Sequence, residues 1–360
     1  MTQPSDPLLP QERAEESIAA IAYYLSTERD PYRRDLLMRD YALRSRNIPK
    51  QSLVEFHERV VDSFLPEEYA LGYQLPARAP DREVMEVDVI IMAVQRIEIQ
   101  AAIAALGISR TPSRSYRERD FYHATVPCRA AGRIDEPTEL SVALTAVGQA
   151  LNLHAMDAVG EISEAYRAQV WILVGMAAGL AGKIRKGDVS FPETVWWYEP
   201  GRERPDMFEP RPELAYRRSL NRQLFRFDPV SESLSARLAR AVAELPDAYR
   251  PADLPADFSP NVTVLKDAVA TGERLLRDPS RLASLHDSNE RIVLGDQESY
   301  GFALACRDLN WIIARGIADY GDEEKDDSWQ YLATLMAVHS VLEFLEQDYI
   351  PPRVDDPSVD

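Results

Sequence analysis

Two aspartates that follow a predicted buried strand are the first candidates for chemistry in this chain. The apolar run at residues 311–314 is expected to form a strand that ends at Arg315-Gly316, and a polar loop then carries Asp319 and Asp322 before a long helix. Ligands of open α/β sheets bind beyond the carboxyl ends of the strands, where carboxylates can transfer protons. Acidic residues before a helix also act as caps, and that simpler role fits Asp322 and the acids after it.

Other common catalytic and cofactor motifs are missing from the sequence. There is no GxGxxG after a strand, no GxxxxGK[ST] phosphate loop, no GxSxG elbow and no HExxH. Cys128 and Cys306 lack CxxC spacing. The scattered histidines are expected to be packing or surface residues; they are His57, His123, His154, His286 and His339. We therefore expect no metal site, no cofactor and no Ser-His-Asp nucleophile.

Charge and hydropathy restrict the partners and the compartment. The formal net charge of −18 argues against nucleic acid or an anionic membrane as a partner, because phosphates would be repelled. The N-terminus lacks the basic and apolar regions of a signal peptide, and the longest apolar window, residues 170–182, is too short to cross a bilayer. With only two cysteines, these features predict a cytoplasmic protein.

The elements that must position the candidate residues divide the chain into three parts. Residues 1–80 carry three short amphipathic helical patterns and a Pro-rich linker, so they predict an all-α N-terminal module. Residues 84–349 alternate buried strands with helices, which predicts a three-layer αβα domain with a mostly parallel central sheet. Residues 350–360 are expected to form a flexible tail. The expected strands are residues 87–93, 140–147, 170–176, 189–198 and 291–294, and the expected helices are 98–106, 149–168, 231–245 and 300–309.

A polar segment at residues 199–218 interrupts this pattern and is rich in arginine and proline. It is either a solvated surface excursion or a loop that presents arginines to an anionic ligand or a partner. Under the second interpretation its candidate phosphate-binding residues are Arg202, Arg204 and Arg211.

Several short motifs follow one another in an order typical of a known superfamily. They are the strand at 87–93 with Glu98, the turn Ala146-Val147-Gly148, the segment 173–179 with Gly187-Asp188-Val189, the turn 270–273, Asp296-Gln297-Glu298, and Arg-Gly-Ile-Ala-Asp at 315–319. Over residues 84–347 this series resembles the nucleoside phosphorylase and methylthioadenosine/adenosylhomocysteine nucleosidase superfamily. It is most similar to the branch that serves as effector domains in bacterial antiphage defence proteins.

The resemblance implies a phosphorylase-like fold and specific roles. Asp319 matches the general acid that protonates N7 of the leaving purine, Glu298 the residue that holds the ribose hydroxyls, and Glu98 the base that orients the attacking water. A carboxyl group keeps a proton near neutrality when burial raises its pKa. The positions that match substrate-binding motifs are Gly148, Met176, Ala177, Ala178, Gly179, Thr271, Leu275, Leu276, Gln297 and Arg315.

Departures from the family pattern bear on the nucleophile and the base pocket. Met176 stands where a hydroxyl residue usually helps to hold phosphate, and no arginine is well spaced after the first strand, which favours water as the nucleophile. Leu275 and Leu276 stand where an aromatic residue would stack on the base. The base pocket is therefore either aliphatic or closed by another aromatic residue, namely Trp196, Trp197, Tyr198 or Tyr300.

The sequence thus predicts an enzyme that hydrolyses the N-glycosidic bond of a purine nucleoside or nucleotide. The favoured substrate is an adenine nucleotide such as ATP, cleaved as a toxic step in antiphage defence. The alternatives are a housekeeping methylthioadenosine/adenosylhomocysteine nucleosidase, a phosphate-dependent phosphorylase, and a nucleotide-binding sensor without catalysis. The N-terminal module is expected to contact a sensor or regulatory protein, and the family resemblance implies a homo-oligomer.

Overall fold

The computed structural model describes residues 84–117, 119–128, 138–204, 207–217, 219–322 and 327–347. The chain divides into two units between Arg82 and Glu83, and all of the described residues belong to the second unit. The expected N-terminal module and C-terminal tail lie outside the described residues.

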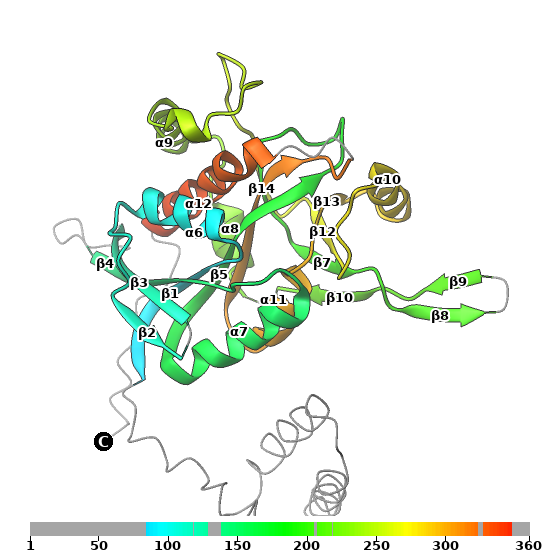
Figure 1. The fold of residues 1–360 in the computed structure, drawn as a ribbon, viewed down its shortest axis with the longest axis horizontal. Coiled ribbons are helices and arrows are strands. Elements are labelled where there is room, and N and C mark those ends of the chain that lie inside the picture. The colour runs from blue at the N-terminus through cyan, green and yellow to red at the C-terminus, as the bar shows by residue number, and fades with distance from the viewer. Residues whose placement is uncertain are drawn as a thin grey trace, which may run out of the picture. The chain divides into compact units, whose positions relative to one another are not determined.

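Two groups of parallel strands meet in one mixed sheet of twelve strands (Figure 1). One group contains β1 (Met85–Ala93), β4 (Thr138–Ala146), β5 (Tyr166–Gly179) and β14 (Trp311–Asp319). The other contains β7 (Thr194–Trp197), β12 (Ala268–Thr271) and β13 (Ile292–Asp296). The groups join where β13 pairs antiparallel with β5, with Leu294 opposite Gly179. The carboxyl ends of both groups therefore converge at this junction.

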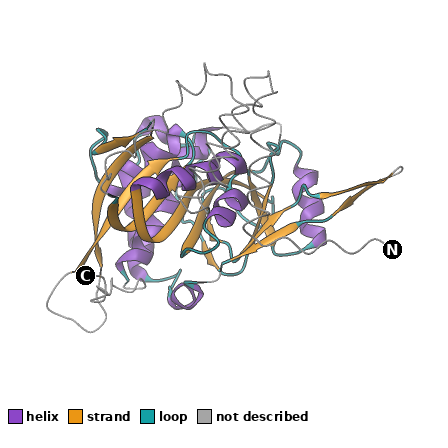
Figure 2. Ribbon diagram, turned by 90° about the horizontal axis from the view of Figure 1, so that it is seen from below, coloured by secondary structure: helices purple, strands orange, loops and turns teal. Residues whose placement is uncertain are grey.

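Antiparallel strands extend the sheet away from the junction. β2 (Arg114–Tyr116) and β3 (Arg119–Cys128) follow β4 at one edge, and β10 (Glu213–Tyr216) pairs with β7 at the other. β6 (Val189–Phe191) pairs with β14 and with β11 (Val262–Val264). β8 (Gly201–Arg204) and β9 (Met207–Pro210) form a separate two-stranded ribbon that extends from the body of the domain in two views (Figures 1 and 2).

Helices cover both faces of the sheet, because alternate residues of the central strands enter two separate cores. Val89 and Ile91 of β1 belong to the core that contains α6 (Arg96–Leu106), α8 (Asn221–Arg226), α9 (Glu232–Ala243) and α12 (Gln330–Glu346). Ile90 and Met92 belong to the core that contains α7 (Asn152–Ala165) and α11 (Ser299–Ala305). The remaining helical elements are η2 (Asp247–Tyr249), α10 (Pro279–Ser288) and η3 (Asp327–Trp329).

The main chain of α12 packs directly against the main chain of β14. A Cβ atom added at Gly316 of β14 would lie 1.9 Å from the carbonyl oxygen of Ala333 in α12, so only glycine fits there. α12 is apolar on nearly all sides and almost entirely buried, as expected for a helix enclosed by the sheet, α6 and α9.

The structure confirms the expected α/β fold with a mostly parallel sheet flanked by helices. Some expected bounds were wrong. β14 continues through Arg315-Gly316 to Asp319, because Arg315 is buried among acidic partners inside the strand. The expected strand 189–198 divides into β6 and β7, and the expected helix 149–168 ends at Ala165, where β5 follows. The elements that were not predicted are strands β2, β3, β8, β9, β10, β11 and β12 and helices α8 and α10. Among the described residues, no helix combines the length and apolar character needed to cross a bilayer.

Candidate active site

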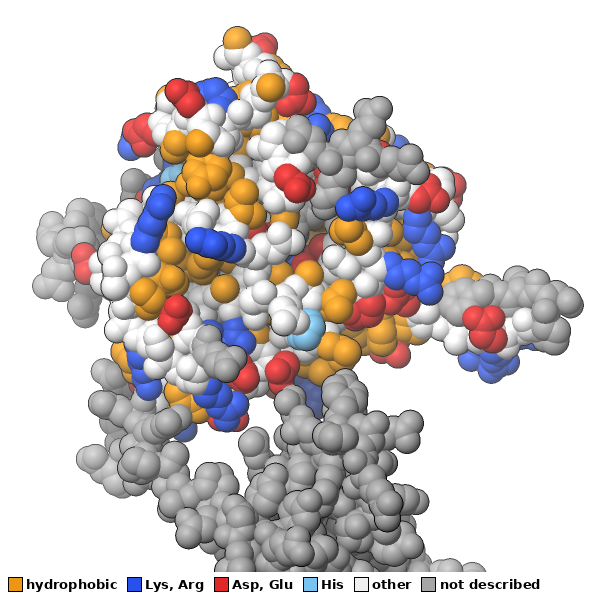
Figure 3. Space-filling model, in the orientation of Figure 1, with side chains coloured by type: hydrophobic (Ala, Val, Ile, Leu, Met, Phe, Trp, Pro, Cys, Tyr) orange, Lys and Arg blue, Asp and Glu red, His pale blue; other side chains and the backbone are white. Residues whose placement is uncertain are grey.

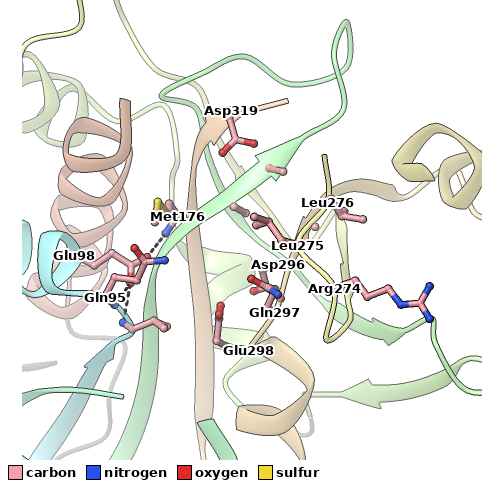
Figure 4. A pocket seen from close by; sticks show the side chains of 14 residues that line it. Gln95, Glu98, Met176, Arg274, Leu275, Leu276, Asp296, Gln297, Glu298 and Asp319 are labelled. Carbon is pink, nitrogen blue, oxygen red and sulfur yellow. Dashed lines mark hydrogen bonds between the residues drawn. The ribbon is translucent and has the colours of Figure 1, made fainter. Parts of the chain in front are cut away.

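A pocket opens where β1, β5, β13 and β14 end, at the junction of the two parallel groups (Figure 4). It contains about 550 Å³ of empty space, part of which is open to solvent. Four carboxylate residues and one arginine line it together with apolar and amide groups: Val94, Gln95, Glu98, Met176, Ala177, Ala178, Arg274, Leu275, Leu276, Gly295, Asp296, Gln297, Glu298 and Asp319.

Glu98 is fixed in the first turn of α6. Its Oε2 accepts hydrogen bonds from the backbone N–H groups of Val94 and Gln95, both at 2.7 Å, and its side chain takes part in a capping box with Gln95. Its Oε1 accepts a third bond, from Met176 N–H at 2.8 Å. The side chain is buried, and this burial raises the pKa of Glu98 against the opposing effects of Arg315 and the backbone donors.

Asp296 ends β13, Glu298 lies two residues further on, and the two share one buried guanidinium. Arg315 of β14 donates from Nε to Asp296 Oδ2 at 2.8 Å and from Nη2 to Glu298 Oε2 at 3.1 Å. Leu151 N–H lies 3.5 Å from the other oxygen of Glu298. Burial raises the pKa of Glu298 to about 8, although Arg315 opposes this rise. Glu298 is therefore largely protonated at neutral pH and can donate as well as accept hydrogen bonds.

Gly175 allows Glu98 and Arg315 to approach each other through β5. A Cβ atom at this position would lie 2.3 Å from Glu98 Oε1 and 2.7 Å from Arg315 Nη1. Its φ of +154° is also one that side-chain-bearing residues rarely adopt. A residue without a side chain is thus required where α6, β5 and β14 meet behind the pocket.

Asp319 reaches the pocket from the last position of β14. Its side chain is buried, and its Oδ1 accepts a hydrogen bond of 2.8 Å from Gly321 N–H, where the chain turns with a positive φ. In Figure 4 Asp319 lies at one end of the pocket, Glu298 at the other, and Glu98 on the wall formed by α6. The three predicted catalytic carboxylates therefore come together from three separate segments of the chain.

The structure brings six of the predicted substrate-binding residues to the pocket: Met176, Ala177, Ala178, Leu275, Leu276 and Gln297. Gln297 Nε2 also donates to Glu273 O at 3.2 Å, which joins two walls of the pocket.

The other four predicted substrate-binding residues do not line the pocket. Gly148 is exposed beyond β4, and Gly179 packs against Ile184 and Ile317. Thr271 is fully buried and donates to Asn152 Oδ1 at 3.2 Å, while Arg315 lies beneath the carboxylates. These four residues were predicted from the order of the motifs, and none of them is among the residues that line the pocket.

The three arginines proposed for phosphate are likewise outside the pocket. Arg202 and Arg204 lie in the exposed ribbon β8–β9 and Arg211 directly follows it, and both Arg204 and Arg211 pair with Glu209. The aromatic residues considered for base stacking are also elsewhere, since none of them lines the pocket. Trp197 stacks on Tyr300 with ring centroids 4.9 Å apart.

Five lining residues were not among the predicted site residues, although one of them, Asp296, belonged to a matched motif: Val94, Gln95, Arg274, Gly295 and Asp296. Val94 and Gln95 directly follow an expected strand, and Gly295 and Asp296 end β13, so their position at strand ends was an available signal. Arg274 lies one residue beyond the matched turn 270–273, and nothing in its local pattern distinguished it from a surface arginine.

Comparison with known proteins places these motifs among nucleosidases. The chain is 28% identical over 271 residues to "ATP nucleosidase Cap17" of Escherichia coli (strain KTE188), covering 73% of this chain and 52% of that protein. The chain resembles nucleosidases in sequence. It is also 28% identical over 82 residues to 5'-methylthioadenosine/S-adenosylhomocysteine nucleosidase of Bacillus cereus (strain B4264), covering 22% of this chain and 36% of that protein. These matches confirm the expected resemblance to the superfamily, although the chain spans only about half of the length of the ATP nucleosidase.

No protein-family model matches the chain. Among solved structures, futalosine hydrolase of Helicobacter pylori strain 26695 aligns with a TM-score of 0.48 at 13% identity, covering 72% of this chain and 97% of that one. The 5'-methylthioadenosine/S-adenosylhomocysteine nucleosidase of Neisseria meningitidis gives a TM-score of 0.48 at 15% identity, covering 72% and 98%.

Proposed function

We propose that this protein is a hydrolase that cleaves the N-glycosidic bond of a purine nucleoside or nucleotide. The observation that carries the proposal is the arrangement of Glu98, Glu298 and Asp319, three buried carboxyl groups that face one pocket from separate segments. Breaking this bond requires a protonated leaving base, support for positive charge on the sugar, and a positioned nucleophile. Three separately held carboxyl groups can supply these three functions.

The environments of the carboxyl groups suit different roles. Glu98 is held by three N–H donors and has a raised pKa, which suits a base that accepts a proton from water near neutrality. Glu298 is held by Arg315 and is largely protonated, so it can bind sugar hydroxyls as donor and acceptor. Asp319, at the far end of the pocket, is placed to protonate the base. Leu275 and Leu276 would form an aliphatic wall for the base.

Water is the nucleophile that this pocket supports best. Inorganic phosphate would need cationic groups beside Glu98, and in the described part of the chain Arg274 is the single cationic residue that lines the pocket. In Figure 4 it lies on the opposite side of the pocket from Glu98. Hydrolysis is therefore favoured over phosphorolysis.

An adenine nucleotide such as ATP is the substrate that we favour, with adenine as a product. The support is the resemblance to an ATP nucleosidase over 73% of this chain. Depleting such a nucleotide in the cytoplasm would make the protein a toxic effector of antiphage defence. In this role residues 1–80 would contact a sensor or regulatory protein, and the catalytic domain would assemble with further copies of itself.

A product assay tests this function. Purified protein is incubated with ATP, AMP, adenosine, methylthioadenosine and NAD, with and without phosphate, and free base is measured by chromatography. We expect adenine from ATP without phosphate, no adenine from Asp319→Asn, and normal release from Asp308→Asn, whose side chain is 75% exposed.

The same assay separates the alternatives. Base release that requires phosphate would indicate a phosphorylase, and release from methylthioadenosine but not from ATP would indicate a housekeeping nucleosidase. If no substrate yields base while ATP still binds, the carboxyl groups serve a nucleotide sensor and the hydrolase proposal fails.

A further inference from the structure

The loop after β12 carries a cation to the mouth of an otherwise acidic pocket. Arg274 lines the pocket, but its side chain is 90% exposed. Its nearest acidic partner is Glu199, with Nε and Oε1 3.9 Å apart, at the limit of an ion pair. Such a contact in water contributes little, so the guanidinium remains available to a ligand.

A second arginine approaches the same place from α10. The guanidinium of Arg281, in the first turn of that helix, lies over the ring of Tyr198 at 5.1 Å from its centroid. Arg274 and Arg281 both act on the Tyr198 hydroxyl, because both lower its pKa while burial raises it to about 12. The two guanidinium groups therefore lie near one phenol. Arg277, in the same segment, is also exposed.

Packing against Tyr198 and two hydrogen bonds hold the turn that precedes Arg274. Tyr198 is buried, and a Cβ atom at Gly272 would lie 2.4 Å from its hydroxyl oxygen, so the phenol packs directly under the turn. Glu273 N–H donates to Glu199 Oε2 at 2.9 Å, and Gln297 Nε2 donates to Glu273 O. The turn at the base of Arg274 is thus fixed to the wall that carries Glu298, while the arginine side chains extend into solvent.

The positive charge of these arginines contrasts with the acidic side chains of the pocket. Glu98, Asp296, Glu298 and Asp319 make the pocket acidic, and the formal net charge of the chain is −18. A phosphate chain would be repelled by this field unless local cations offset it. Guanidinium groups bind phosphate oxygens bidentately. Three of them lie within the eight residues 274–281, and the first, Arg274, lines the pocket. Figure 3 shows Lys and Arg side chains gathered around α10 on this face.

We propose that Arg274, Arg277 and Arg281, together termed the arginine rim, bind the 5′-phosphate chain of a nucleotide substrate and make the enzyme prefer nucleoside polyphosphates over nucleosides. This rests on the proposed function and assigns its phosphate subsite to the loop after β12 and the start of α10. The exposed ribbon β8–β9, with Arg202 and Arg204, then has a different role.

The test compares two triple variants. Arg274→Ala/Arg277→Ala/Arg281→Ala removes the rim, and Arg202→Ala/Arg204→Ala/Arg211→Ala is the matched control of three other exposed arginines. Release of base from ATP and from adenosine is measured at several KCl concentrations. The rim variant is expected to lose kcat/KM for ATP by roughly tenfold for each arginine that contacts a phosphate. Its kcat/KM for adenosine should stay within about threefold, and its salt dependence with ATP should weaken.

Two results would overturn the proposal. An equal loss with adenosine and ATP would show that the arginines only support the loop, and a loss confined to the β8–β9 variant would assign the phosphates to that ribbon. ATP binding to the Asp319→Asn protein, measured by calorimetry with and without the rim, separates the two levels of the argument. If the wild type releases no base, the hydrolase proposal fails, whereas equal ATP affinity with and without the rim refutes the rim alone.

Discussion

Replacing Arg315 with methionine should destabilise the α/β domain by an amount that grows with pH. The guanidinium is fully buried and contacts Asp296 at 2.7 Å and Glu298 at 3.1 Å. Its own burial disfavours its charge, yet the two carboxylates outweigh that effect and raise the pKa of Arg315. Methionine has a similar volume but no charge, so the substitution leaves buried carboxylates without their counter-ion.

The size of the effect follows from the cost of an uncompensated buried charge. Removing one partner of a buried pair typically costs about 3–5 kcal/mol. For a domain of this size each kcal/mol shifts Tm by roughly 2–4 °C, which gives a loss of about 6–20 °C near pH 8. Arg315 holds down the pKa of Glu98 and Glu298, so its loss raises both further. Stability is lost where the wild-type group would ionise and the variant's group stays protonated, so the cost grows as pH rises through the folded pKa of Glu298, about 8, and shrinks below it.

Differential scanning calorimetry of wild type and Arg315→Met at pH 6, 7, 8 and 9 measures this dependence. The double variant Arg315→Met/Glu298→Gln is the internal control, because it removes a buried acidic group that has lost its counter-ion and should recover part of the stability at pH 9. A Tm loss that is the same at pH 6 and pH 9, together with no recovery in the double variant, would refute the electrostatic explanation and leave packing as the cause.

Two further predictions concern the same centre. Glu298→Gln should flatten the pH dependence of stability: the pKa of Glu298 is about 8 in the folded state against 4.5 in the unfolded state, so wild-type stability falls between pH 5 and 8 by at most about 1.4 kcal/mol per pH unit. Urea denaturation at pH 5.5, 6.5 and 7.5 measures both slopes, and identical slopes would contradict the assignment. Gly175→Ala should cost about 1–3 kcal/mol and abolish most base release, because its Cβ would lie 2.3 Å from Glu98 Oε1. Gly182→Ala, where φ is +80° and no atom lies within 4 Å of the added Cβ, is the control for backbone strain alone, and equal activity in the two variants would exclude the steric explanation.

The central strands were predictable because each is an almost uninterrupted apolar run. Residues 87–93 and 170–176 are buried on both faces by helices, so their sequences contain little that could indicate another structure. The extension of β14 was not predictable in this way. Arg315 looks like a chain break in the sequence, and only its partners Asp296 and Glu298, distant in sequence, make it compatible with a buried strand.

Site residues near the ends of strands could be predicted from the sequence, whereas the position of residues in loops and hairpins could not. Glu98, Glu298 and Asp319 each lie at or just beyond the end of a strand, and the structure brings them together. Arg202 and Arg204 were candidates for phosphate binding under one of two interpretations of their segment, and they lie in an exposed ribbon outside the pocket. The direction of a hairpin depends on its turns and on the edge strand beside it, which composition does not encode.

The contact between Gly316 and Ala333 has a consequence for how such a site can be controlled. Arg315 and Asp319 flank a point where strand and helix touch through main-chain atoms, with no side chain between them that could change rotamer. The segment of β14 that carries Arg315 and Asp319 is therefore held in place, and moving it would require α12 to separate from the sheet. The side chains of Arg274, Leu275 and Arg277, by contrast, are exposed at the surface. A regulator that binds this domain would therefore act on these exposed side chains and leave Glu98, Glu298 and Asp319 in place.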